Sequence, residues 1–498
     1  MIVVLFIVLF ALVFLIIRHF KKGQRSHVEP TVLSVSQHVR HIELQQMSAE
    51  FGNFFALASK NGEGGTQFVT SDPAVANEIF VAKFQHFSDR KDFSSKTGHV
   101  FIASGDHWKK LRRRVSVFSN TKVKKLTPLL NAAVDSLLRT IEANEEGKAF
   151  NFHNTSLHLV AAILARIAFC RVHQLDHTAQ FCDTYTAYAE QLLLLKEKAR
   201  LSRALPPANI GQNAQQQNGA NFDMFTELYK HILELEMQKK HEQKQQQQQN
   251  NNSPAGDDDA YDEECQCHLF ACTLANFFLE NAMKSVGIDT IGHCLALVIH
   301  FMANRPLVQH RLREELTASV VGDEVKLVKA IIKETLRLCP IVSFASSRRC
   351  TSTPSSPCGV QLNSEKIMLN VGDSVEVDVF TMGRNRAVWG EDAEQFRPER
   401  WLDDGSLPAD WQLHWLPFGG FGPRHCVGLP LANKVLETAI SQLFRRFHFT
   451  SAADTSTEEI RLVGSDVLWP EEVLIRAEIV DENEDEHVGH QQQTTDNH

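Results

Sequence analysis

The glycine-rich stretch at residues 417–428, PFGGFGPRHCVG, constrains this chain more than any other part of it. Glycine carries no Cβ, so such a loop lets main chain come very close to a flat neighbouring group. Cys426 lies just before a helical pattern at residues 429–447. Free N–H groups and the dipole at a helix start favour a thiolate over a thiol. Because thiolates bind soft metals and haem iron, the stretch predicts a ligand cysteine; the alternative is a buried cysteine beside a flexible turn.

This stretch resembles the haem-ligand loop of the cytochrome P450 superfamily, which reads Phe-x-x-Gly-x-Arg-x-Cys-x-Gly. Four of the pattern's positions are in register here: Gly422, Arg424, Cys426 and Gly428. The family's phenylalanine position holds Gly419, and Phe418 lies one residue earlier. The resemblance implies that Cys426 is the axial ligand of the iron in haem b and that the rest of the loop binds the cofactor. The displaced phenylalanine bears on how the sulfur is shielded.

Composition fits one large catalytic domain, since 43% of the 498 residues are hydrophobic and length alone is a soft guide to domain number. The formal net charge of −9 and the absence of a nucleic-acid-binding motif give no reason to expect nucleic acid as a partner. The ten cysteines show no regular spacing. Cys265 and Cys267 form a close pair, but no second pair of ligands accompanies them, which argues against a zinc site. The irregular spacing of the cysteines suits the reducing cytosol.

The chain begins with an unbroken apolar run at residues 1–17, followed by basic residues within 18–25. This run is long enough for a thin bilayer such as that of the endoplasmic reticulum. Positive charge on its C-terminal side alone places the rest of the chain in the cytosol. We therefore predict an uncleaved transmembrane anchor in the endoplasmic reticulum membrane and a linker at 18–42. The alternative is a cleaved signal peptide, which would need a basic start and a small-residue cleavage site.

Two further stretches match the family in order and spacing: FSDRKDF at 87–93 and GDHWKKLR at 105–112. Trp108 and Arg112 are four residues apart, so they share one face of a helix. In the family this pair points at a haem propionate. A guanidinium forks onto a carboxylate and an indole N–H adds one donor, so the chemistry fits. The alternative is an ordinary basic helix with a packed tryptophan.

The same region is strongly basic over two neighbouring segments: Lys109, Lys110, Arg113, Arg114, Lys122, Lys124 and Lys125. These charges form either a solvated face or a docking surface for an acidic electron donor. The chain has neither a GxGxxG fingerprint nor a flavin-binding segment. The resemblance therefore implies electrons from a separate NADPH–cytochrome P450 reductase, with cytochrome b5 as a further candidate donor.

Residues 206–220 and 240–263 are rich in Gln, Asn, Gly or acidic residues, and cannot bury enough apolar area to fold. We interpret them as surface insertions in a catalytic domain at 43–480. They fall where the family has its variable, substrate-covering helices. Residues 481–498 are acidic and then rich in Gln, Thr and His, which predicts a disordered tail.

A long apolar helix pattern at 269–305 contains the sequence VGIDT at 286–290. It resembles the family's central-helix motif, Ala/Gly-Gly-x-Asp/Glu-Thr, with Val286 in place of a small residue. The resemblance implies that Asp289 and Thr290 relay protons to bound dioxygen, and that Val286 narrows the cavity above the iron. The alternative is a threonine that bonds its own helix backbone in the core.

Glu334 and Arg337 are three residues apart on a predicted helix, a spacing that many exposed helices also show. In the family such a pair joins a later arginine, here Arg400, in a buried charge cluster behind the haem. Buried charges are tolerated only when they bond to one another, so this cluster would fix the core rather than catalyse.

The substrate pocket is predicted from two segments near the haem. Ile341, Val342 and Phe344 follow Pro340 on an expected strand edge, and Val467 lies at the turn of a final β-region at 460–480. Arg348 or Arg349 would reach the second propionate. These assignments come from the resemblance.

The resemblance covers nearly the whole chain after the anchor and implies a mainly α fold with a small β region. It implies a haem-thiolate monooxygenase acting on a lipophilic substrate such as a fatty acid, sterol or xenobiotic. Three other classes stay open: an isomerase or dehydratase of hydroperoxides on the same fold, a catalytically impaired haem-binding membrane protein, and a haem-free structural membrane protein. A carbon monoxide difference spectrum separates the last from the others.

Overall fold

The computed structural model describes residues 40–57, 65–90, 100–101, 103–114, 120–143, 147–169, 287–320, 324–343, 347–402, 407–452, 460–464 and 467–480. The predicted anchor, both low-complexity insertions and the C-terminal tail lie outside these ranges, as do Val286 and Phe344. Within the ranges, no single helix is long and apolar enough to span a membrane.

Helices make up most of this part of the chain, as predicted. The α-helices are α2 (Arg40–Phe51), α3 (Pro73–Asn77), α4 (Gly105–Arg114), α5 (Asn120–Lys124), α6 (Thr127–Glu142), α7 (Phe152–Phe169), α11 (Ile288–Ala303), α12 (Pro306–Ala318), α13 (Lys326–Leu338), α14 (Val379–Met382), α15 (Arg386–Trp389), α16 (Trp411–His414) and α17 (Leu429–Arg446). Shorter irregular helices are η1 (Glu78–Ala82), η2 (Phe84–His86) and η5 (Pro398–Trp401).

Four small sheets complete the fold, and only the β2–β7 pair is parallel among the described strand pairs. In spatial order, the strands of the four-stranded sheet are β1 (Phe54–Leu57), β2 (Gln67–Thr70), β7 (Ser374–Val377) and β4 (Arg348–Arg349). The three-stranded sheet consists of β3 (Phe150–Asn151), β11 (Leu474–Ile479) and β8 (Phe447–Ser451). The two remaining sheets are the pairs β5 (Gly359–Leu362) with β6 (Ile367–Asn370), and β10 (Trp469–Pro470) with β9 (Leu462–Val463).

The β-region expected within 460–480 is confirmed, as is the helix after Cys426. The described part of the chain opens with a helix, because residues 40–51 form α2. His41, Leu44 and Ser48 are buried at steps of three and four residues, which is the period of a helix. The first described strand begins at Phe54.

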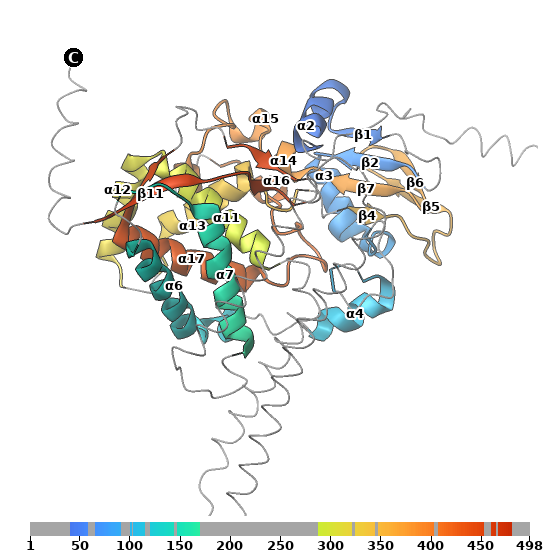
Figure 1. Ribbon diagram of the computed structural model, residues 1–498. Coiled ribbons are helices and arrows are strands. Elements are labelled where there is room, and N and C mark those ends of the chain that lie inside the picture. Colours follow the sequence, from blue (N-terminus) through green and yellow to red (C-terminus); the bar gives the residue numbers. More distant parts are fainter. Residues whose placement is uncertain are drawn as a thin grey trace, which may run out of the picture.

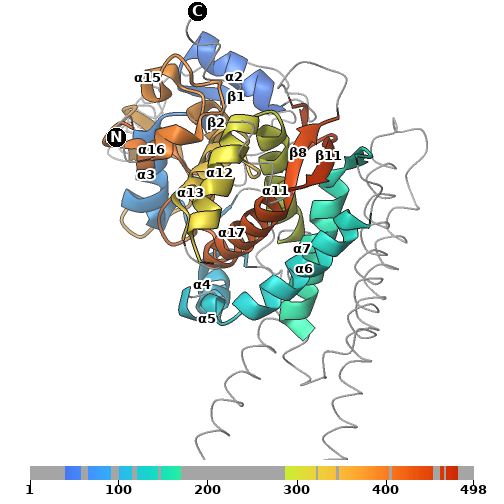
Figure 2. The same ribbon diagram turned by 90° about the vertical axis from the view of Figure 1, so that its left-hand side faces the viewer.

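Helix α11 forms the centre of the main hydrophobic core. Its residues 294–299 are all at most 2% exposed, and it contacts α7, α12, α13, α17 and β8. A helix that is apolar all round must be covered on every side. Figures 1 and 2 show α6, α7, α13 and α17 around it. Pro306 at the first position of α12 starts a new helix, bent by 111° from α11.

A second core lies beneath the four-stranded sheet, beside α3 and η1 (Figure 1). Asp72 caps α3, because its side chain accepts the N–H groups of Ala74 and Val75, and Pro73 fits the first helical position. The cap fixes where η1 starts. This matters for the site, because η1 is the element against which the Cys426 loop closes.

Candidate functional site

The loop before α17 is shaped by glycines in the left-handed region of backbone space. Gly419, Gly420 and Gly422 have φ of 79°, 71° and 82°. A Cβ on Gly422 would lie 2.1 Å from the carbonyl oxygen of Phe80 in η1, so no other residue fits there. At Gly422 the close approach that glycine permits is therefore to the backbone of η1. The glycines let the loop close on η1.

Cys426 is held at the end of this loop by backbone hydrogen bonds. Its N–H donates to the carbonyl oxygen of Phe418 at 2.9 Å, and the N–H groups of Gly428 and Leu429 point at its sulfur. Burial nevertheless raises the pKa of the thiol, although these N–H groups and nearby guanidiniums lower it. The N–H groups at the helix start thus favour the thiolate, as expected, while burial opposes it. A bound metal cation would reverse the balance, since a coordinating thiol is deprotonated.

Three buried arginines lie beside this cysteine: Arg90, Arg348 and Arg424, exposed by 7%, 1% and 6%. Burial, then repulsion among them, lowers their pKa values, to about 9 for Arg348 and for Arg90 well below its usual range. The pKa of Arg424 falls to about 10, again mainly through burial. Clustered buried guanidiniums are costly without an anion, so the cluster favours an anionic ligand.

The unsatisfied N–H groups of this cluster test whether haem fits. The Nε and Nη1 atoms of Arg90 and the Nε atom of Arg424 are buried without a hydrogen-bond partner among the described residues. A buried N–H group normally has a hydrogen-bond acceptor. Haem b carries two propionates and an iron that takes a thiolate, so the donor set around Cys426 fits it.

Arg90 was not singled out from the sequence, where it is one of two basic residues in the 87–93 stretch. Its signal was position alone: it follows Ser88 and Asp89 in a segment that the resemblance had already matched. Of the two arginines proposed for the second propionate, Arg348 is buried, whereas Arg349 is exposed. The structure therefore favours Arg348 for that role.

Helix α4 is tied to the loop through both of its predicted site residues. The Trp108 ring is 5% exposed and carries the Arg424 guanidinium 4.3 Å from its centroid. Arg424 also donates to the Ala103 carbonyl oxygen at 2.6 Å, directly before α4. The Nη1 of Arg112 donates to the carbonyl oxygen of His425 at 2.9 Å, one residue before Cys426. Trp108, Arg112 and Arg424 thus meet in one place.

Asp289 and Thr290 lie half-buried in the first turn of α11. That end of the helix is fixed to α7. The Ser156 hydroxyl lies 2.8 Å from the Gly292 carbonyl oxygen, and a Cβ on Gly292 would come within 2.8 Å of the Leu157 side chain. A glycine is therefore required for this helix–helix approach.

The two segments predicted to line the substrate pocket meet in the structure. Val342 and Val467 form an isolated antiparallel bridge, and the Leu468 N–H donates to the Ile341 carbonyl oxygen at 2.7 Å. Both valines pack on the main core, and Ile341 is 3% exposed. Tertiary pairing, not sequence distance, makes them neighbours.

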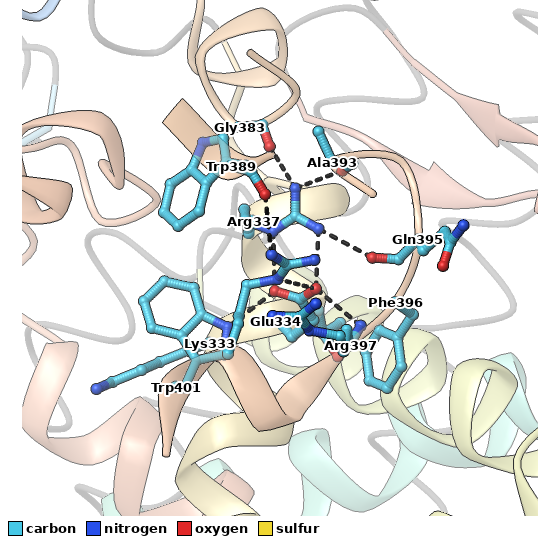
Figure 3. Close-up of polar contacts among 12 residues, drawn as sticks. Lys333, Glu334, Arg337, Gly383, Trp389, Ala393, Gln395, Phe396, Arg397 and Trp401 are labelled. Atoms are coloured by element: carbon cyan, nitrogen blue, oxygen red, sulfur yellow. Dashed lines mark hydrogen bonds and ion pairs between the residues drawn. The ribbon is translucent and has the colours of Figure 1, made fainter. Parts of the chain in front are cut away.

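Glu334, Arg337 and Arg400 form a buried network (Figure 3). The Glu334 carboxylate accepts two hydrogen bonds from Arg337 at 2.8 Å each and one from the Arg400 Nε at 2.9 Å. The indole N–H of Trp401 and the backbone N–H of Arg397 complete its shell at 2.8 and 2.9 Å. This carboxylate joins α13 to η5 and has no free oxygen left for catalysis.

A thiolate-ligand loop at a helix start, buried arginines with open N–H groups, and a helix-rich fold with small sheets define the haem-thiolate class of proteins. The sequence model described as Cytochrome P450 matches residues 30–473, and the chain belongs to that family. The family implies haem as cofactor, oxidoreductase chemistry of the monooxygenase type, redox partners and lipophilic substrates in general.

The relatives include two proteins of Caenorhabditis elegans named "Putative cytochrome P450 cyp-13B1" and "Putative cytochrome P450 CYP13A1". The chain is 25% and 26% identical to them, over 87% of this chain and 88% of each relative. A third relative, "Putative cytochrome P450 CYP13A6" of the same organism, is 29% identical over 39% of this chain and 37% of its own length.

Proposed function

We propose that the protein is a membrane-anchored monooxygenase that inserts one atom of dioxygen into a lipophilic substrate such as a fatty acid, a sterol or a xenobiotic. One observation carries this proposal: the Cys426 sulfur faces two backbone N–H groups, and the Nε and Nη1 atoms of Arg90 and the Nε atom of Arg424 beside it lack an acceptor among the described residues. That arrangement suits a thiolate-ligated cofactor with carboxylate side chains.

Bound haem would supply the activation of dioxygen, which electron donation by the thiolate promotes. The N–H groups of Gly428 and Leu429 stabilise negative charge on the Cys426 sulfur. Arg90, Arg348 and Arg424 would hold the propionates of bound haem.

Two further parts of the chain contribute to the proposed site. Trp108 stacks on the Arg424 guanidinium and so fixes the direction in which its N–H groups point. The Asp289 carboxylate and the Thr290 hydroxyl lie at the half-buried start of α11 and pass protons toward the reacting oxygen.

Electrons come from a separate NADPH-dependent reductase that docks on α4. Lys109 and Arg113 are exposed on this helix, and the Lys109 ammonium is engaged only by the exposed carboxylate of Asp106 among the described groups. A basic surface steers an acidic partner into place. Arg112 on the same helix bonds to the residue before Cys426, so the docking helix is in direct contact with the ligand loop.

The membrane anchor at residues 1–17 and the endoplasmic reticulum as location belong to this proposal. The apolar run and its basic C-terminal flank support them. Fractionation of cells that express the full chain, with and without residues 1–17, tests the anchor directly.

The reduced protein bound to carbon monoxide tests the cofactor assignment. We expect a haem-thiolate difference spectrum for the wild type and its loss in Cys426→Ser. Cys358→Ser is the matched control, because Cys358 is exposed and lies in a different part of the fold. A thiolate spectrum that persists unchanged in Cys426→Ser would overturn the proposal.

Turnover of a lipid extract with reductase and NADPH tests the reaction class. Oxygenated products should require both additions. Rearrangement or dehydration of hydroperoxides without any external electron donor would instead favour the isomerase or dehydratase alternative.

A further inference from the structure

Four of the six tryptophans of the chain form one aromatic cluster beside the Cys426 loop: Trp389, Trp401, Trp411 and Trp415. The Trp401 ring lies 5.5, 5.2 and 5.7 Å from the other three, measured between ring centroids. These are tilted and edge-to-face contacts of the kind that aromatic rings prefer. Indole is also among the side chains that give up one electron most readily.

The cluster reaches the ligand loop through Trp415. Its ring centroid is 6.4 Å from that of Phe418. The Phe418 carbonyl oxygen in turn accepts the N–H of Cys426 at 2.9 Å. Ring contact and one hydrogen bond therefore connect the predicted iron ligand to a half-buried tryptophan.

Cations lie over every indole of the cluster except that of Trp415. The Lys333 ammonium is 5.4 and 5.2 Å from the centroids of Trp401 and Trp411, and Figure 3 shows Lys333 beside Trp401. The Arg337 guanidinium lies 5.3 Å from Trp389. Within the described residues no cation is found over Trp415.

A positive charge on a ring face opposes the loss of an electron from that ring. Trp415 is therefore the member of the cluster that is oxidised most easily. Trp108, also close to the ligand loop, is disfavoured in the same way by Arg424 at 4.3 Å. The indole N–H of Trp415 donates to the Lys333 carbonyl oxygen at 3.1 Å, and its partial exposure gives the released proton a route to water.

We propose that Trp415 is a one-electron relay between the haem-thiolate site and solvent, and that the Lys333 ammonium confines the oxidised state to this residue. The proposal rests on the proposed function. It gives the enzyme a way to discharge oxidising equivalents that an organic hydroperoxide leaves at the cofactor, before they reach Cys426 or the Glu334 network.

The electrons balance with an external reductant such as ascorbate. Reduction of the hydroperoxide to an alcohol and water consumes two electrons and two protons. Trp415 supplies them in two successive events, each time losing one electron and its indole proton. Ascorbate returns one electron and one proton after each event, so the tryptophan is regenerated.

The test treats purified holoprotein with cumene hydroperoxide, with and without ascorbate. Mass spectrometry maps oxygen added to each tryptophan, and haem absorbance gives the lifetime of the cofactor. Without ascorbate we expect oxygen added to Trp415 and little on Trp108. Ascorbate should suppress this modification and slow the loss of haem.

Two substitutions and one control distinguish electron relay through Trp415 from oxidation of Trp415 merely because it lies near the haem site. In Trp415→Phe, haem should be lost severalfold faster, and ascorbate should no longer protect it. In Lys333→Met, which keeps the apolar stem, the modification should spread to Trp401 and Trp411. Lys329→Met is the control, since Lys329 lies one turn earlier on α13 and pairs with Glu324 at 2.6 Å. It should leave the wild-type pattern unchanged.

The relay is overturned if Trp108 is modified before Trp415 in the wild type, or if Lys333→Met and wild type give the same map. Protection by ascorbate that survives in Trp415→Phe overturns it as well. A holoprotein that lacks a haem-thiolate spectrum before peroxide is added removes the proposed function and the relay together. A normal spectrum with Trp415 unmodified removes the relay alone.

Discussion

Replacement of Glu334 by glutamine should destabilise the protein far more than loss of any surface charge. The carboxylate is fully buried and accepts five hydrogen bonds, three of them from the guanidiniums of Arg337 and Arg400. Glutamine removes the negative charge and puts an NH₂ group where an oxygen now accepts a donor. Both guanidiniums stay buried with their charge uncompensated at this point.

The magnitude follows from that burial. Removal of one partner of a buried ion pair costs about 3–5 kcal/mol. Arg337 cannot escape, because it also donates to the carbonyl oxygens of Gly383, Ala393 and Gln395 at 2.5, 2.6 and 3.1 Å. Arg400 retains Asp392 at 3.1 Å, which offsets part of its cost. Because total stabilities are about 5–15 kcal/mol, this loss is a large share.

Urea denaturation followed by tryptophan fluorescence measures the effect, since Trp401 itself belongs to the network. Glu315→Gln is the matched control: its pair with Arg311 spans one helical turn at 3.4 Å, with side chains 33% and 46% exposed. That control should lose only about 0.3–0.5 kcal/mol. If the free energy of unfolding of Glu334→Gln lies within about 1 kcal/mol of the wild-type value, the reasoning from buried charge is refuted, because a broken buried pair should cost more than that.

Three further predictions concern other parts of the fold. Gly422→Ala should prevent haem incorporation and strongly lower the free energy of unfolding, because its Cβ would strike the Phe80 carbonyl. Gly52 is the control: it also has positive φ but lies in open space, so Gly52→Ala should lower the free energy of unfolding by only about 1 kcal/mol in the same urea assay. Burial, then a nearby guanidinium, lowers the pKa of His41 to about 4, so its neutral form is favoured in the fold. Stability should fall as pH drops from 6.5 to 4, by at most about 3 kcal/mol before solvent screening, and His41→Phe should flatten this slope of the pH–stability curve. Gln309→Leu should cost about 1–3 kcal/mol for each of the buried backbone groups it leaves unbonded, and calorimetry that finds no destabilisation would contradict this.

Local sequence patterns were enough to predict the elements that carry the site. A cysteine after a glycine loop and before an apolar period of 3.6 residues predicts a ligand at the start of a helix, and α17 begins at Leu429. The three-residue spacing of Glu334 and Arg337 already puts them on one helix face. Such features depend on neighbours in the chain, which the sequence contains.

The protonation and packing of these groups depend instead on contacts between remote segments. Burial raises the pKa of the Cys426 thiol despite the helix start, and Gly422 is needed because η1 packs against it. Arg90 joins the arginine cluster from a segment far away in sequence, and among the described residues no cation lies over Trp415, whereas each of its three tryptophan neighbours has one. Desolvation and charge–charge interactions depend on distance in space. They are therefore set by packing between remote segments, which no local pattern of residues encodes.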